Sequence, residues 1–208
     1  MTIFSFEELQ PVFLMEAKDV FMQFVKENTD KVPYIFSIVP RDYSPADCST
    51  SFSITACANT KFHYENQSKD ESDEAEKKYY YYSAEEFEMK YNFPKTDEII
   101  LHYCIENKNS ISDDKTYEYT KEFLKFKANL YDFLIKNIIY LKNTGFFNSV
   151  YKEKMIIDVF FPDFDGESDE KGMKEYYAVK KIIQRFKKFN PEEDEKQYKK
   201  YLDVFCGD

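Results

Sequence analysis

The sequence predicts a single α+β domain in which helices, one of them long and central, flank a mostly antiparallel sheet. Three observations predict this class. Apolar residues recur with helical spacing in several segments, β-branched and aromatic residues concentrate in others, and no linker separates two cores. The chain has 208 residues, 43% of them hydrophobic, including 18 Tyr and 21 Phe, which is enough for one sizeable core. We therefore expect residues 1–208 to form one domain.

The first predicted element is a helix. Ser5 and Glu8 have the spacing of a capping box. Pro11 suits the first turn of the main helix, or else it separates a short turn from that helix. Residues 28–30 are polar and end it. Apolar side chains follow one another along a single face of this helix: Phe13, Ala17, Val20, Phe21 and Phe24.

Two strands are predicted next. Residues 32–39 are rich in β-branched and aromatic side chains and are closed by Pro40. A polar loop over 41–49 follows. Residues 51–58 alternate apolar and polar side chains, which indicates a half-buried strand antiparallel to the first.

The segment 65–78 contains no large apolar side chain, and we expect it to be a mobile, acidic, solvated excursion. Four tyrosines follow at 79–82, and their high β-propensity predicts a short strand. Ser83 and Glu86 are spaced to cap a turn of helix that carries Phe87.

The C-terminal half is predicted to be mainly helical. Thr96 is the expected cap of a short helix through Cys104, with a strand as the alternative. The longest helix runs from about Asp114 to Asn143, and Gly145 ends it. The segments after it are a strand at 155–161 stopped by Pro162, an acidic loop at 163–171, a helix at 174–189 and a last helix from Pro191.

Charge restricts the classes of partner. Lys and Arg total 29 and Asp and Glu total 39, which gives a net charge of −10. A negative surface repels phosphates, so we expect no direct nucleic-acid binding, and it favours a protein with a basic surface. No apolar run approaches the roughly 18 residues of a membrane span, so we expect no membrane partner. The N-terminus lacks a basic start, and the four cysteines form no C-x-x-C pair, which favours a cytoplasmic protein with free thiols.

Catalytic and cofactor motifs are not found. The four glycines are too scattered for a phosphate-binding loop, and we expect no cofactor. His102 and Cys104 would share a face only in a strand. A zinc site would require two distant segments to converge, and the residues concerned are Cys57, His63, His102 and Cys104. We assign no catalytic, cofactor-binding or metal-binding residue.

Asp163-Phe164-Asp165-Gly166 resembles the middle of a calcium loop. With Gly166 at the sixth position, however, Phe161 and Gly172 fall where the first and last ligands belong, so a strand-to-helix turn is the better interpretation. An alternative function is a carboxylate-based, metal-dependent hydrolase or nuclease that uses Asp158, Asp163 and Asp165.

Several short motifs, taken in order, resemble a bacterial family of unknown function, the domain family numbered 4303. They are the strand Tyr34–Ile38 after an amphipathic helix, Asn59-Thr60, Tyr82-Ser83-Ala84-Glu85-Glu86-Phe87, Gly145-Phe146-Phe147, Pro162-Asp163 and Phe189-Asn190-Pro191. Phe87 stands where the family has tryptophan. The resemblance covers nearly the whole chain and implies an antiparallel sheet flanked by helices, but no established activity. By analogy with proteins found near toxin or mobile-element genes, an immunity role is reasonable.

The main hypothesis is a non-enzymatic, acidic binding protein, such as an immunity protein or an inhibitor of a basic protein. A phage-type mimic of DNA charge is a further alternative. For the tyrosines, the structural alternative is an ordinary strand with two buried rings. The expected partner contacts are Asp70, Glu71, Asp73, Glu74, Tyr79, Tyr80, Tyr81, Tyr82, Asp163 and Asp165.

Overall fold

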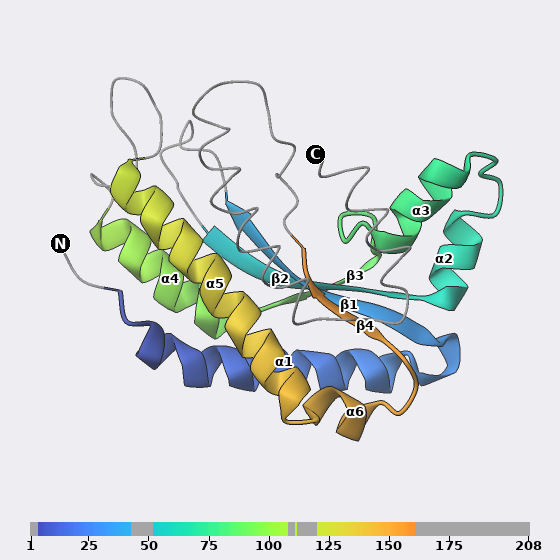
Figure 1. The fold of residues 1–208 in the computed structure, drawn as a ribbon, viewed down its shortest axis with the longest axis horizontal. Helices are drawn as coiled ribbons and strands as arrows, with labels where there is room; N and C mark the ends of the chain where they lie inside the picture. Colours follow the sequence, from blue (N-terminus) through green and yellow to red (C-terminus); the bar gives the residue numbers. More distant parts are fainter. Residues whose placement is uncertain (1–3, 43–51, 108–110, 112–119, 161–208) are drawn as a thin grey trace.

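The computed structural model describes residues 4–42, 52–107, 111 and 120–160 (Figure 1). In this part of the chain, four strands form one sheet in the order β3-β2-β1-β4, with helices on both faces. The predicted α+β class is confirmed. The strands are β1 (Pro33–Asp42), β2 (Phe52–Thr60), β3 (Met89–Asn92) and β4 (Ile156–Val159). The helices are α1 (Phe6–Glu27), α2 (Lys61–Gln67), α3 (Glu74–Tyr82), α4 (Pro94–Glu106), α5 (Lys121–Asn143) and α6 (Phe146–Val150), with a 3-10 turn, η1, at Thr29–Lys31.

The sheet is mostly antiparallel, as predicted. β2 pairs antiparallel with both β1 and β3, whereas β4 pairs with β1 in parallel. A parallel partner requires a crossover connection, and here the chain between β3 and β4 includes α4, α5 and α6.

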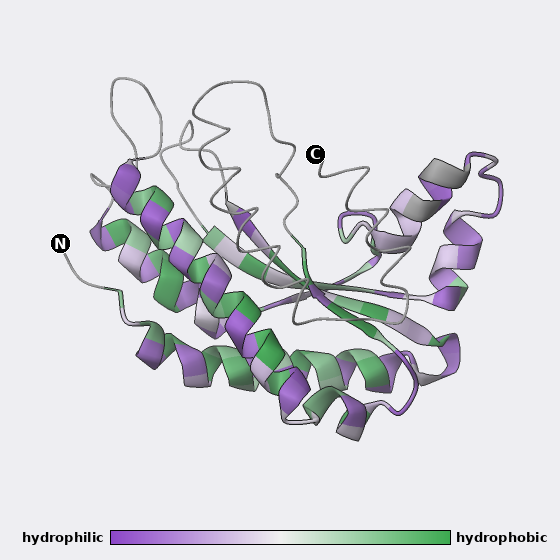
Figure 2. Ribbon diagram, in the orientation of Figure 1, coloured by the Kyte–Doolittle hydropathy of each residue, from purple (hydrophilic) through white to green (hydrophobic). Residues whose placement is uncertain are grey.

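The larger hydrophobic core lies between the sheet and helices α1, α4, α5 and α6. Phenylalanine rings of α1 contact rings of the sheet and of α6. The ring centroid of Phe21 lies 5.2 Å from that of Phe36 and 4.9 Å from that of Phe147. Figure 2 shows hydrophobic residues along α1, α5 and the central strands, and few in α2. A smaller core on the other face packs α3 and the residues after it against β1 and β2.

The first helix and the first two strands form where the sequence predicts them. The second strand was predicted to be half-buried, but β2 is buried along almost its whole length, because a core packs on each face of the sheet. Ser5 caps α1, since its Oγ accepts a hydrogen bond from the Glu8 backbone N–H at 3.2 Å. Pro11 is the sixth residue of α1 and therefore lies beyond the first turn, in which it was predicted. β1 is longer than predicted because Arg41 and Asp42 also pair with β2, and this pairing takes two residues from the predicted loop at 41–49.

The residues predicted to form the acidic excursion and the short strand after it, 65–82, are mostly helical. α2 and α3 cover much of 65–78, and the four tyrosines lie in or at the end of α3. The strand prediction for 79–82 was therefore wrong. Tertiary packing of the rings against the sheet outweighs their β-propensity. Ser83 and Glu86 form a turn, in which the Glu86 N–H donates to the Ser83 carbonyl at 3.1 Å, and Phe87 is buried beside it.

The predicted helix through Cys104 is confirmed as α4, so the strand alternative is wrong, but the cap of this helix is not Thr96. α4 begins at Pro94, and Thr96 is buried within its first turn. The backbone N–H groups of Lys95 and Thr96 each donate to the Glu16 carboxylate of α1 at 2.9 Å. A buried side chain from another helix therefore does the work of the predicted local cap.

The strand β4 agrees with its prediction, and the long helix α5 ends as predicted at Asn143. The predicted start of this helix near Asp114 was wrong, because Thr120 is extended (φ −70°, ψ 160°) and the helix begins at Lys121. Thr120 caps α5, since its Oγ1 accepts from the Phe123 N–H at 3.2 Å, and residues 112–119 lie outside the described part. Gly145 follows the helix with φ +73°, as expected of a C-terminal glycine. The loop at 163–171 and the helices predicted after it also lie outside the described residues.

Candidate functional site

The most acidic described segment runs from α2 to the start of β3, and we call residues 61–88 the acidic arm. It contains nine Asp and Glu residues against four Lys, which accounts for half of the net charge of −10. It consists of α2, a short turn, α3 and the turn around Phe87. In Figure 1, α2 and α3 lie at one end of the sheet, on the face opposite α1.

A group of tyrosines anchors the acidic arm to the sheet. The Tyr34 ring of β1 stacks on Tyr81 at 4.4 Å, and Tyr64 of α2 meets Tyr81 edge to face at 4.9 Å. The Tyr34 hydroxyl donates to the Tyr81 carbonyl at 2.9 Å. Burial, with a smaller contribution from Tyr81, raises the pKa of Tyr34 well above its usual range, so the hydroxyl stays protonated as this donor requires.

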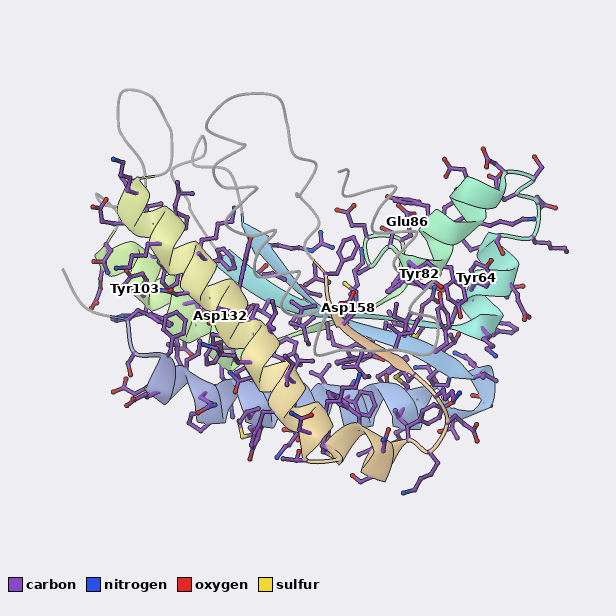
Figure 3. The ribbon with its side chains drawn as sticks, viewed as in Figure 1. Tyr64, Tyr82, Glu86, Tyr103, Asp132 and Asp158 are labelled. Carbon is purple, nitrogen blue, oxygen red and sulfur yellow. The ribbon has the colours of Figure 1, made fainter. Side chains whose placement is uncertain are left out.

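Polar contacts join the two ends of the acidic arm. His63 Nδ1 contacts the Glu88 carboxylate, and the Tyr79 hydroxyl donates to Glu86 Oε1 at 3.2 Å. Burial raises the pKa of Tyr79, and the neighbouring Glu86 charge acts in the same direction. In Figure 3, Tyr64, Tyr82 and Glu86 lie close together where α2 and α3 meet. These contacts fix α2 and α3 relative to the sheet.

The predicted contact residues in the acidic arm divide into two groups. Asp70 and Asp73 are exposed in the turn between α2 and α3, and Glu71 is half-buried there. The Asp73 N–H donates to Glu71 Oε1 at 2.8 Å, which orders the turn. Tyr82, by contrast, is buried in the smaller core and is not available to a partner.

The remaining predicted contacts are less well placed. Tyr79, Tyr80 and Tyr81 are half-buried in α3. Glu74 lies in α3, but its side chain is outside the description, and Asp163 and Asp165 lie outside the described residues altogether. The exposed carboxylates of the turn are therefore the accessible part of the predicted surface.

The sequence reading missed a row of polar residues on the sheet face that carries the smaller core. Ser37 of β1 pairs with Cys57 of β2 on one side and with Asp158 of β4 on the other. All three are buried. Asp158 Oδ1 accepts from the Val159 N–H at 2.7 Å, and Ser37 Oγ has no hydrogen-bond partner among the described residues.

Burial also governs the chemistry of this row. It raises the pKa of the Cys57 thiol, and the nearby Arg41 and Lys90 only partly oppose this effect. A thiol with a raised pKa is a poor nucleophile at neutral pH. The period-two alternation of the strands could have placed Ser37 and Cys57 on one face, but the parallel register that adds Asp158 is a long-range feature. The hydrolase alternative stays an untested prediction, since Asp163 and Asp165 are not described.

The zinc and thiol–histidine alternatives find no support in the geometry. Cys57 belongs to the smaller core and Cys104 to the larger one, so the two thiols lie on opposite sides of the sheet. His102 is exposed on α4, where the helix separates it from Cys104. Within the described ranges, no three His, Cys, Asp or Glu side chains form a group that could hold a metal ion.

None of the described helices combines the length and the apolar character needed to cross a membrane. The fold and the acidic arm define the class of protein as an α+β domain with a charged helical projection. The profile of the family described as Domain of unknown function (DUF4303) matches residues 14–175. The chain belongs to this family. No curated protein and no solved structure matches it.

Proposed function

We propose that this chain is a non-enzymatic binding protein that uses the acidic arm to bind a protein with a basic surface. The observation that carries the proposal is the combination of a fixed base and an exposed acidic tip. Tyr34, Tyr64 and Tyr81 hold the base against the sheet, while Asp70 and Asp73 are exposed at the turn.

Two physical effects favour this use of the acidic arm. Concentrated negative charge accelerates encounters with a basic protein and disfavours acidic partners and nucleic acids. A surface that is already ordered loses less conformational entropy on binding than a flexible acidic loop would. The tyrosine contacts supply that order, because they tie both helices to β1.

The more specific proposal is an immunity protein or inhibitor that acts in the cytoplasm on a basic toxin or enzyme. The net charge of −10 supports a basic target. A DNA-mimic inhibitor would share the same acidity and differ only in the identity of the target. The partner itself decides between the two.

The experiment compares two variants of equal charge. One carries Lys at Asp70, Glu71, Asp73 and Glu74 in the acidic arm, and the control carries Lys at Asp19, Glu98, Glu106 and Glu153 on other elements. Each set adds eight units of charge and changes the net value from −10 to −2. Tagged wild type and both variants are used for affinity purification from the source organism at low and moderate salt, with quantitative mass spectrometry.

We expect one basic protein to co-purify with the wild type and the control, and to be lost with the acidic-arm variant. Loss with both variants would show that overall charge and not the acidic arm is responsible. Equal recovery with all three proteins would contradict the proposal, as would the absence of any salt-sensitive basic partner.

A further inference from the structure

A row of four polar side chains crosses the sheet on the face that carries the smaller core. Ser37 of β1 pairs with Cys57 of β2, and Cys57 pairs with Lys90 of β3. On its other side, Ser37 pairs with Asp158 of β4, which is labelled in Figure 3. Directly opposite residues of antiparallel strands have their Cβ atoms about 4.5–5.5 Å apart. The row is buried from Asp158 to Cys57 and reaches solvent at the exposed Lys90.

Arg41 brings a second positive charge to this row. It lies four positions after Ser37 in β1, so its side chain is on the same face of the sheet. Burial raises the pKa of the Cys57 thiol, whereas the charge of Arg41, its hydrogen bond to the thiol and the charge of Lys90 oppose this effect. Neither Arg41 nor Lys90 forms an ion pair with a described residue. Two cations without a counter-ion therefore meet beside Cys57.

Two buried hydrogen-bonding groups next to Cys57 lack a partner. Ser37 is 0% exposed, and its Oγ makes no hydrogen bond within the described part of the chain. Arg41 Nη2 is also buried and without a partner there. Such groups are rare in folded proteins, because leaving them unpaired costs free energy, most of all for a charged donor. A bound group that accepts hydrogen bonds from both would remove this cost.

Two carboxylates lie near the row, and neither satisfies these donors. Asp158 accepts a hydrogen bond from the Val159 N–H at 2.7 Å, while Ser37 Oγ beside it makes none. Glu85 is exposed, and its charge affects the Cys57 thiol less than the charges of Arg41 and Lys90 do. Positive charge therefore predominates beside Cys57. The acidity of the rest of the surface acts weakly here, because salt screens exposed charges beyond about 8 Å.

We propose that Ser37, Arg41 and Lys90 bind the oxyanion group of a small molecule, a carboxylate or a phosphate, beside Cys57. The guanidinium donates in a planar fork that fits the oxygens of either group, and the Ser37 hydroxyl donates a further hydrogen bond. Arg41 is half-buried and Lys90 is exposed, so the ligand approaches from this side of the sheet. The site lies on the sheet and not at the acidic turn, and it does not depend on the proposed function.

The first test is isothermal titration calorimetry and thermal unfolding of the full chain with inorganic phosphate and with succinate. Sodium chloride at equal ionic strength is the control for screening. We expect at least one probe to bind and, at about 100 times its Kd, to raise the melting temperature by about 5–11 °C. Binding of phosphate alone assigns a phosphate-bearing ligand, and binding of succinate alone assigns a carboxylate-bearing one. If neither probe binds, or if chloride gives the same rise, the proposal is overturned.

The second test measures the Kd of the bound probe for four variants. Ser37→Ala removes a hydroxyl without a partner, so it should be at least as stable as the wild type without the probe and yet bind about threefold more weakly. Arg41→Gln should weaken binding about tenfold and Lys90→Gln about threefold. The control Lys26→Gln removes an exposed charge in the last turn of α1 and should change the Kd less than about 1.5-fold.

The variants separate this site from general charge effects. If Ser37→Ala and Arg41→Gln bind the probe like the wild type, the proposal is overturned. The same holds if Lys26→Gln weakens binding as much as Lys90→Gln does, because the effect would then follow the net charge and not the site.

Discussion

Glu16 offers the most direct test of how the fold is held together. Its side chain is only 7% exposed, and its two carboxylate oxygens accept the N–H groups of Lys95 and Thr96, each at 2.9 Å. These N–H groups belong to the first turn of α4 and have no partner within their own helix. Glu16→Ala removes both acceptors at once and leaves two donors without their partner, one of them on the buried Thr96.

The magnitude follows from these two hydrogen bonds. A hydrogen bond to a charged group contributes about 1.5–3 kcal/mol, so the pair contributes about 3–6 kcal/mol before offsets. Removing the carboxylate also removes its burial cost and its repulsion of Asp97, whose pKa Glu16 helps to raise. The free energy of unfolding therefore falls by about 2–3 kcal/mol, which lowers the melting temperature of a domain of this size by about 4–12 °C.

The assay is urea and thermal unfolding of Glu16→Ala, Glu16→Gln and the control Asp19→Ala. Asp19 lies on the same helix and is exposed, so its removal should cost less than about 0.5 kcal/mol. Glu16→Gln keeps one oxygen acceptor and should fall between the two. If Glu16→Ala is as stable as Asp19→Ala, the capping role is refuted.

Three further predictions concern pH, the end of α5 and the base of the acidic arm. Burial raises the pKa of Asp97 to about 6, so its contribution to stability is complete at low pH and is lost as the pH rises through about 6. Asp97→Asn does not titrate, so the difference between its free energy of unfolding and that of the wild type should shift by about 1 kcal/mol in favour of the variant from about pH 4 to pH 7.5, with the partial exposure of Asp97 taken into account. Urea titrations at the two pH values measure this difference, and a difference that does not change with pH would contradict the prediction. Gly145→Ala should lower the free energy of unfolding by about 1 kcal/mol, because alanine is strained at a φ of +73°. Nothing lies within 4 Å of the added Cβ, so backbone strain is the only expected cost, and an unchanged melting temperature would refute it. Tyr34→Phe removes the donor to the Tyr81 carbonyl, 2.9 Å away, and should cost about 1 kcal/mol and speed hydrogen exchange in α3; unchanged exchange there would argue against the anchor.

The sequence predicts those elements whose signal is local. The apolar stripe of α1, its Ser5 cap, the two antiparallel strands and Gly145 after α5 all depend on residues within a few positions of one another. β3 is absent from the prediction, because its four residues are too few to show a reliable alternation.

The features that the sequence does not reveal depend on distant residues. The cap of α4 comes from Glu16, 79 and 80 positions away from the N–H groups that it binds. The tyrosines of α3 were predicted as a strand from their β-propensity. The partners that hold Tyr81 in a helix, Tyr34 and Tyr64, are brought to it only by the fold. For the candidate site, the acidity of residues 70–74 could be predicted, whereas the buried position of Tyr82 could not.

The most direct test of the central claim is the association rate constant of the chain with its purified partner, measured at increasing salt. We expect the wild type and the Asp19, Glu98, Glu106 and Glu153 control to associate fast at low salt and to slow steeply as salt is added. The acidic-arm variant at Asp70, Glu71, Asp73 and Glu74 should associate at least about tenfold more slowly at low salt and depend little on salt. Equal rates for the two variants would contradict the claim that the acidic arm is the binding surface.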